Sequence, residues 1–215
     1  GIFYKKFIFI LLILNGINSY SNDPNIIFIT VDGVRPHEFF LGKPGYKAPN
    51  NEWPVFDLPV FPYIWNSLYK TSSILGDKHA NEAGFIVSNP HMVSLPAYVS
   101  MMRGSVQLWC WTNQCSGINK ESFVERLVRE KKFPPHKVTV VSSWYKIKRS
   151  IINKNKKTKI NNFFYSTGFL RGKNQYEDKF LTELYLKQKN EEMEWGDARK
   201  DKFTHLEAIH LLKTN

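Results

Sequence analysis

Cysteine is scarce in this 215-residue chain, which contains only Cys110 and Cys115. Two thiolates make a poor zinc site, because a closed structural site needs four ligands.

Long apolar runs are also missing. The unbroken run Phe7–Leu14 has eight residues, far fewer than the roughly 20 that span a bilayer. We therefore expect no stable membrane anchor.

Acidic residues are missing from the stretch 146–159, which carries seven of the basic residues. Two more lysines, Lys5 and Lys6, precede the apolar run, so the net charge of +11 leaves only +2 for the rest of the chain. This distribution argues against a nucleic-acid-coating protein. The basic stretch has no aromatic side chain to stack on bases. A solvated loop or helix face is favoured there over binding to nucleic acid or an anionic membrane.

Residues 1–21 have the pattern of a secretory signal peptide, with a cationic start, the apolar run, and Ser19 and Ser21 at the expected cleavage positions. A buried N-terminal helix is the alternative. Export would place the remaining domain, 22–215, in the periplasm or outside the cell. Cysteines this close commonly form a disulfide in such an oxidising compartment, so we expect a Cys110–Cys115 bond; two unpaired buried thiols are the alternative.

The hydrophobic content of 42% is enough for a buried core and excludes a disordered chain. Short apolar runs predict strands, and amphipathic patterns predict helices. Their alternation indicates an α/β fold with a mostly parallel sheet flanked by helices. The chain stops directly after a helix, which suggests a C-terminal truncation. The expected strands are Asn25–Val31, Gly84–Ser88, Lys137–Ser142 and Asn162–Ser166; the expected helices are Pro62–Thr71, one starting just after Ser94, Asn119–Lys132, and about 176–189 and 201–213.

Three residues near these elements could carry chemistry. Asp32 follows an expected strand, where a carboxylate can hold a metal, although Asp-Gly there is more often a turn. Ser94 lies at an expected helix start, where free amides favour an anion and an activated hydroxyl could act as a nucleophile; a simple N-cap serine is the alternative. Arg35 could bind an anionic substrate, and a surface salt bridge is equally compatible.

Five blocks in order resemble the alkaline phosphatase superfamily, in particular its secreted sulfatase- and phosphatase-like members. The blocks are NIIFITVDGVR (25–35), NPHMVSLPAYVSMMRG (89–104), CWTNQC (110–115), VVSSW (140–144) and WGDARKDKFTHLEAIHLLK (195–213). The resemblance implies an alkaline-phosphatase-like core with two zinc ions. It also implies that Asp32 ligates one metal and that Ser94 is the nucleophile touching that metal.

The sequence departs from that family in its second half, where further Asp and His ligands are expected. It has no Asp-His dipeptide, and its downstream histidines are His136, His205 and His210. His205 and His210 are five positions apart, which on a helix separates them by about 140°, so they cannot share a metal. Either the missing ligands lie beyond Asn215 in a longer parent protein, or the chain is a non-catalytic remnant.

These features together predict a metal-dependent hydrolase of small phosphate or sulfate esters that uses a serine nucleophile and binds no nucleic acid. The alternatives are a catalytically inactive, truncated secreted domain that serves as a binding module, and a phosphodiesterase or mutase on the same scaffold. The nucleophile motif does not separate these enzyme classes.

Overall fold

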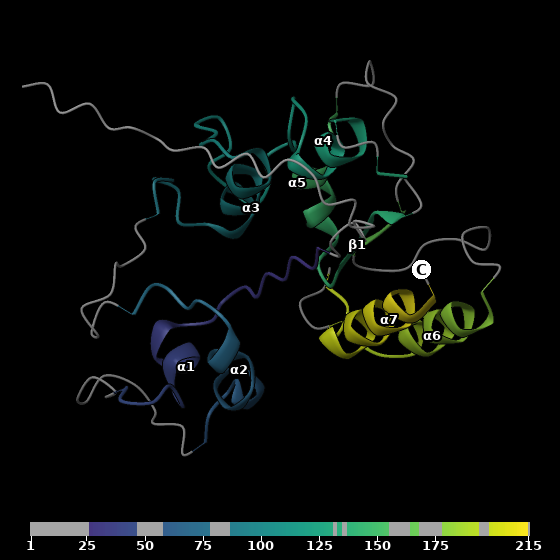
Figure 1. Cartoon of the computed structure of the whole chain (residues 1–215). Coiled ribbons are helices and arrows are strands. Elements are labelled where there is room, and N and C mark those ends of the chain that lie inside the picture. The colour runs from purple at the N-terminus through teal and green to yellow at the C-terminus, as the bar shows by residue number, and fades with distance from the viewer. Residues whose placement is uncertain are drawn as a thin grey trace, which may run out of the picture.

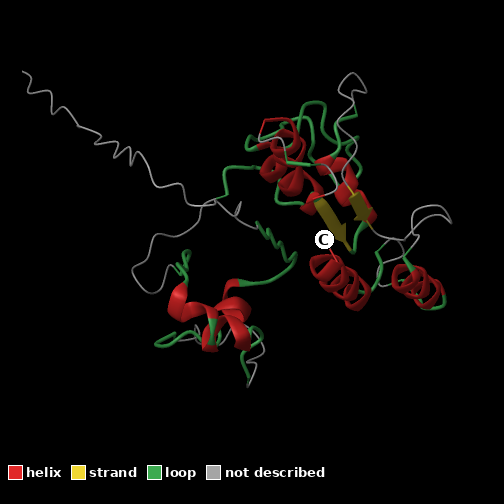
Figure 2. Ribbon diagram, turned by 45° about the vertical axis from the view of Figure 1, so that its right-hand side comes forward, coloured by secondary structure: helices red, strands yellow, loops and turns green. Residues whose placement is uncertain are grey.

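The structure is a computed structural model that describes residues 26–46, 58–77, 87–130, 133–134, 137–154, 164–167, 178–193 and 198–214. The expected signal peptide lies outside these residues. Helices dominate the regular structure (Figure 2). The elements are α1 (Pro36–Phe40), α2 (Pro62–Asn66), η1 (Leu68–Thr71), α3 (Ser94–Arg103), α4 (Phe123–Glu130), β1 (Thr139–Ser142), η3 (Tyr145–Ile147), α5 (Lys148–Ile151), β2 (Phe164–Thr167), α6 (Lys179–Lys189) and α7 (Asp201–Thr214).

The predicted α/β core with a mostly parallel sheet is wrong. Strands β1 and β2 pair in parallel, with Thr139 opposite Phe164, and they form the only sheet within the described ranges. Residues 26–31, expected to be a strand, have no strand partner there. Most of the expected strand Gly84–Ser88 lies outside those ranges, and its last two residues are not in a strand. An apolar, β-branched run favours a strand, but a strand forms only where another strand pairs with it.

The main core lies where α3 packs against α4 and α5. Leu95, Val99 and Met102 are buried and recur along α3 at spacings of four and three, so they share one face of the helix. Two small clusters result. One joins Leu95 and Val99 to Cys110 and Ile118, and the other joins Met102 to Val124 and Ile151. This face fixes the orientation of α3 and therefore of the residues at its start.

Helices α1 and α2 form a second cluster, which lies apart from the other helices in both ribbon views (Figures 1 and 2). Trp65 is buried, and its indole Nε1 donates a 2.7 Å hydrogen bond to the backbone oxygen of Phe39. The rings of Phe39 and Phe40 contact the Trp65 ring at centroid distances of 5.5 and 6.0 Å. Aromatic packing of this kind contributes beyond the burial of apolar area.

Helices α6 and α7 lie side by side, and α7 also contacts β1 (Figure 1). Trp144, just after β1, forms an isolated antiparallel bridge with Ala198, just before α7. Arg199 N donates a 3.0 Å hydrogen bond to the backbone oxygen of Ser143. These contacts place the start of α7 beside the carboxyl end of β1.

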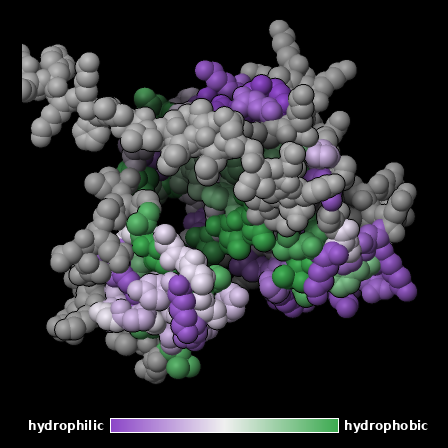
Figure 3. All heavy atoms as spheres, viewed as in Figure 1, coloured by the Kyte–Doolittle hydropathy of each residue, from purple (hydrophilic) through white to green (hydrophobic). Residues whose placement is uncertain are grey.

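The segment 26–31 crosses between these groups of helices and exposes its apolar side chains. Ile29 is 77% exposed, and apolar atoms gather at the centre of the face in Figure 3, where Figure 1 shows this segment. Phe28 alone makes a ring contact with α4, through Phe123, at 5.5 Å. In the described part of the chain, no helix is both long and apolar enough to cross a membrane.

The first part of the basic stretch is only partly the solvated surface that its composition predicts: Lys148 and Lys154 are exposed, whereas Lys146 is buried. Lys146 is only 7% exposed, and its Nζ lies 5.3 Å from the centroid of the Trp144 ring. The Arg149 guanidinium donates a 3.1 Å hydrogen bond to the backbone oxygen of Cys115. Aromatic faces and carbonyl oxygens thus accommodate these two cations. Residues 155–159 lie outside the described part.

Candidate functional site

Helix α3 begins at Ser94, one residue earlier than the sequence predicts, and Pro96 lies in its first turn, where a missing N–H costs little. The N-cap residue is Val93, with extended backbone angles (φ −131°, ψ 144°) and no side-chain cap. Ser94 is therefore the first helical residue rather than the N-cap. The helix ends at Gly104, whose φ of +68° is favourable only for glycine among common residues.

The amides at the start of α3 are almost all accounted for. Leu95 N donates to Asn113 Oδ1 at 2.9 Å, Ala97 N donates to Val93 O at 3.1 Å, and Pro96 has no N–H. Ser94 is half-buried, and neither its N–H nor its hydroxyl makes a hydrogen bond with another described residue. The positive end of this helix therefore presents one amide and one hydroxyl, both from Ser94.

A disulfide-closed loop supplies the Asn113 cap. Cys110 and Cys115 are bonded to each other, with a Cα–Cα distance of 5.2 Å. Cys110 is fully buried and packs against Leu95, the residue whose amide Asn113 binds. The loop and the helix start therefore share one core cluster. The sequence marked the two cysteines but not Asn113, because a cap supplied from 18 positions away leaves no local pattern.

Tyr98 lies one helical turn after Ser94 and is influenced by two carboxylates from distant parts of the chain. It follows Ser94 by four positions, so the two lie on the same side of α3. Burial raises the pKa of the Tyr98 hydroxyl, a hydrogen bond with Thr30 opposes this, and the carboxylates of Asp32 and Asp201 raise it further. Both carboxylates are thus close enough to act on a group one turn from Ser94. Asp32 itself is exposed and lies in a turn.

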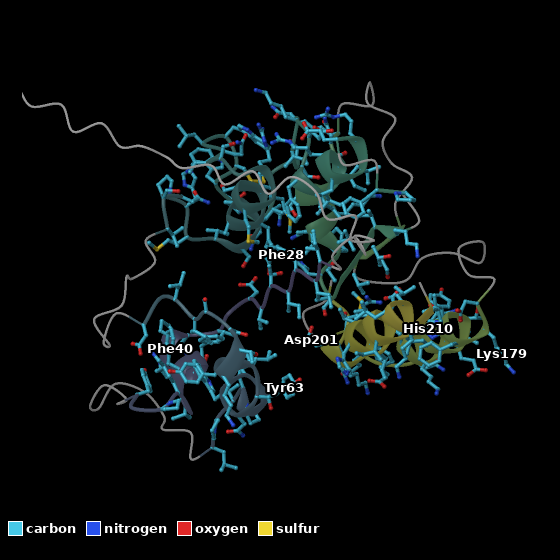
Figure 4. The ribbon with its side chains drawn as sticks, viewed as in Figure 1. Phe28, Phe40, Tyr63, Lys179, Asp201 and His210 are labelled. Atoms are coloured by element: carbon cyan, nitrogen blue, oxygen red, sulfur yellow. A yellow bond between two sulfur atoms is a disulfide. The ribbon has the colours of Figure 1, made fainter. Side chains whose placement is uncertain are left out.

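Asp201 comes close enough to influence Tyr98 because α7 starts beside the carboxyl end of β1. The Ser143 hydroxyl donates a short hydrogen bond to Asp201 Oδ1, and its oxygen lies 2.7 Å from Thr204 Oγ1. In Figure 4, Asp201 lies near the centre of the view, at the end of α7 that faces the labelled Phe28. Two carboxylates that are 169 positions apart in sequence therefore both act on the pKa of Tyr98.

Arg35 makes a local ion pair at the start of α1. Its guanidinium binds Glu38, and its backbone N donates to Glu38 Oε2 at 2.8 Å. The Glu38 hydrogen bond raises the pKa of Arg35, and the same contact lowers the pKa of Glu38. This contact corresponds to the salt bridge that the sequence left open. A substrate-binding role for Arg35 stays a prediction.

The described residues do not fit the two-zinc centre that the family resemblance implies. No three of their His, Cys, Asp and Glu side chains come together in a way that could hold a metal ion. His205 is exposed on α7, and His210 contacts Asp178 instead. Asp32 and Asp201 raise the pKa of Tyr98, one turn from Ser94, and the cysteines are bonded to each other.

No protein-family model matches this chain, and neither a curated protein nor a solved structure matches it. The resemblance to the alkaline phosphatase superfamily therefore rests on the five sequence blocks alone.

Proposed function

We propose that this chain is the serine-bearing part of an exported hydrolase of phosphate or sulfate esters, with Ser94 as its nucleophile. The observation that carries this proposal is the start of α3, where Ser94 offers an amide and a hydroxyl that no other described residue engages. Amides at the positive end of a helix bind anionic oxygens of phosphate and sulfate. The five sequence blocks support the same assignment.

In the proposed reaction, an ester oxygen accepts a hydrogen bond from Ser94 N. The Ser94 oxygen attacks phosphorus or sulfur, the alcohol leaves, and water then releases the group bound to Ser94. A serine hydroxyl is a weak nucleophile unless a base takes its proton. Asp32 and Asp201 are the candidate bases, because both carboxylates influence the pKa of Tyr98, one turn from Ser94.

The resemblance also implies zinc. The proposed attack by Ser94 uses only residues of this chain. Two carboxylates near Tyr98 are fewer than the three or four ligands of a typical catalytic zinc site. Zinc content measured on the purified full chain tests the implied metal independently of the role of Ser94.

The test compares hydrolysis of p-nitrophenyl phosphate, p-nitrophenyl sulfate and bis(p-nitrophenyl) phosphate by the full chain and by Ser94→Ala. We expect Ser94→Ala to lower kcat/KM at least about 1,000-fold, as for other removed nucleophiles. Ser100→Ala is the matched control, because Ser100 lies on the same helix and donates only to the backbone oxygen of Pro96. Equal activity of Ser94→Ala and the unchanged chain would rule out the proposed nucleophile.

A non-catalytic anion-binding module is the second candidate. It is favoured by the absence of a three-ligand group among the residues described. Such a module would bind phosphate, measured by calorimetry, and would turn over none of the three esters. Phosphate binding would still depend on the Ser94 amide at the start of α3. Ser94→Pro removes the amide hydrogen and would abolish phosphate binding, whereas Ser94→Ala keeps it and would not.

A further inference from the structure

We infer that the disulfide-closed loop 110–115 positions Ser94 by holding Asn113 as the cap of α3. The contact that carries this inference is the 2.9 Å hydrogen bond from Leu95 N to Asn113 Oδ1. The consequence for catalysis rests on the proposed function, whereas the capping role does not.

Helix α3 depends on this distant cap because its own N-cap provides none. Val93 has no side-chain oxygen, and a serine, threonine, aspartate or asparagine usually occupies this place. Asn113 supplies the missing acceptor from another loop. Without it, the Leu95 amide in a buried part of the helix start would lose its partner, a cost comparable to that of a lost cap.

The disulfide fixes both ends of the short loop that carries Asn113. Cys110 is fully buried in the cluster with Leu95 and Val99, and Cys115 packs against the same cluster. Within the loop, Cys115 N donates to Thr112 O at 3.2 Å, and Gln114 N donates to Thr112 Oγ1 at 3.2 Å. Asn113 thus lies in the turn that these two hydrogen bonds close. A cross-link across so short a loop restricts the positions that Asn113 can adopt.

The oxidation state of the two cysteines is therefore linked to the start of α3. In the oxidised chain, Asn113 Oδ1 holds Leu95 N, and the adjacent Ser94 keeps its first-turn geometry. Reduction adds two electrons and two protons, breaks the sulfur–sulfur bond and gives two thiols; dithiothreitol supplies both and becomes its cyclic disulfide. The freed loop then holds Asn113 less firmly, and the helix start opens more often.

The experiment measures hydrogen exchange of the Leu95 amide in the full chain, oxidised and after reduction with dithiothreitol. We expect Asn113→Ala to speed this exchange at least about tenfold, as loss of a cap bond of roughly 1.4 kcal/mol would. Asn113→Asp keeps an acceptor oxygen and should preserve the slow exchange. Gln114→Ala is the matched control, because Gln114 is exposed in the same loop.

Reduction decides whether the disulfide acts through Asn113. Exchange of the Leu95 amide should rise on reduction of the unchanged chain but not further in Asn113→Ala. Cys110→Ala/Cys115→Ala, without reductant, should match the reduced chain. The inference is overturned if reduction leaves this exchange unchanged, if it accelerates exchange equally in Asn113→Ala, or if Asn113→Asp behaves like Asn113→Ala.

Ester hydrolysis is followed in the same samples. Where the unchanged chain hydrolyses p-nitrophenyl phosphate, Asn113→Ala should lower kcat at least about tenfold and Asn113→Asp should restore it. An unchanged kcat in Asn113→Ala would overturn the positioning of Ser94. If the unchanged chain hydrolyses no ester, the proposed function fails, and the exchange measurements still decide the capping role.

Discussion

Arg199 and Glu207 form an ion pair, Nη2 to Oε2 at 2.7 Å, in which both side chains are fully buried. Arg199 Nε also donates to Thr204 Oγ1 at 2.8 Å, and the Ser166 hydroxyl donates to Glu207 Oε2 at 3.0 Å. Burial raises the pKa of Glu207, and the contacts with Arg199 and Ser166 act in the opposite direction. The pair therefore joins β2, the segment before α7, and α7 itself.

Removing one partner of this pair should be far more harmful than removing both. We expect Arg199→Met to lower the free energy of unfolding by about 3–5 kcal/mol, because it leaves Glu207 buried without a counter-charge. The double variant Arg199→Met/Glu207→Leu should recover most of that loss, because both charges are then gone. Urea unfolding of the three proteins measures this, and a double variant no more stable than Arg199→Met would contradict it.

The contact between α6 and α7 should weaken in acid. His210 Nε2 lies 2.6 Å from Asp178 Oδ2, and the His210 ring stacks on Phe180 with centroids 4.4 Å apart. The His210 hydrogen bond, followed by that from Leu181 N, lowers the pKa of Asp178 below its usual range. Because the pKa of Asp178 is lower in the folded chain than in the unfolded chain, its ionised carboxylate stabilises the fold. This stabilisation is fully present above the pKa of Asp178 in the unfolded chain, about 3.9, and is lost as the pH falls through its pKa in the folded chain.

Asp178→Asn isolates this effect. Asparagine keeps the oxygen that caps Leu181 N at the start of α6 but cannot ionise. The unchanged chain should therefore lose more unfolding free energy than Asp178→Asn when urea titrations at pH 5 and pH 3 are compared. Added salt should reduce the difference, because both groups are partly exposed. The same loss in both proteins would show that Asp178 does not contribute.

Gly117 should tolerate alanine much less well than Gly33. Both have left-handed φ angles, +91° and +77°, which cost alanine about 1–2 kcal/mol. At Gly117 an added Cβ would also lie 2.7 Å from Arg149 O, the acceptor for Ile118 N, and overpacking adds about 1–3 kcal/mol. At Gly33 it would meet nothing within 4 Å. Thermal unfolding of Gly117→Ala and Gly33→Ala gives the comparison, and equal losses would contradict it.

Replacing Ser94 and replacing Asn113 with alanine should have different effects on the stability of the chain. Asn113→Ala should lower the free energy of unfolding by about 1.4 kcal/mol, within the usual range for a lost helix cap. Ser94→Ala should change it by no more than about 0.5 kcal/mol, because its hydroxyl makes no hydrogen bond to a described residue. Chemical unfolding of both variants tests this. The opposite order would show that Ser94, rather than Asn113, is the cap.

Local patterns predicted several elements of this fold well. Pro96 in the first turn predicts a helix that starts just after Ser94, and α3 starts one residue earlier, at Ser94 itself. The expected strands Lys137–Ser142 and Asn162–Ser166 overlap β1 and β2, and the last expected helix starts at Asp201, as α7 does. The amphipathic helix expected from residue 119 starts later, at Phe123, because Ser122 and Glu125 form its cap.

The parallel sheet was the main error. The run from Ile26 to Val31 has the composition of a buried strand, yet most of its side chains are exposed. A strand needs a neighbour on at least one side, and composition does not say whether one is available. The burial of Lys146 does not follow from composition for a similar reason, because its position over the rings of Trp144 and Tyr145 depends on how the chain turns there.

The sequence by itself determined the start of α3 to within one residue and the closeness of Cys110 and Cys115, because both depend on residues a few positions apart. The tertiary structure decided what surrounds Ser94. It brought Asn113 to the Leu95 amide, and it placed Asp32 and Asp201 close enough to raise the pKa of Tyr98. These contacts depend on how the helices pack and on where α7 meets β1. Such long-range packing is set by the summed burial of many side chains, which no short pattern encodes.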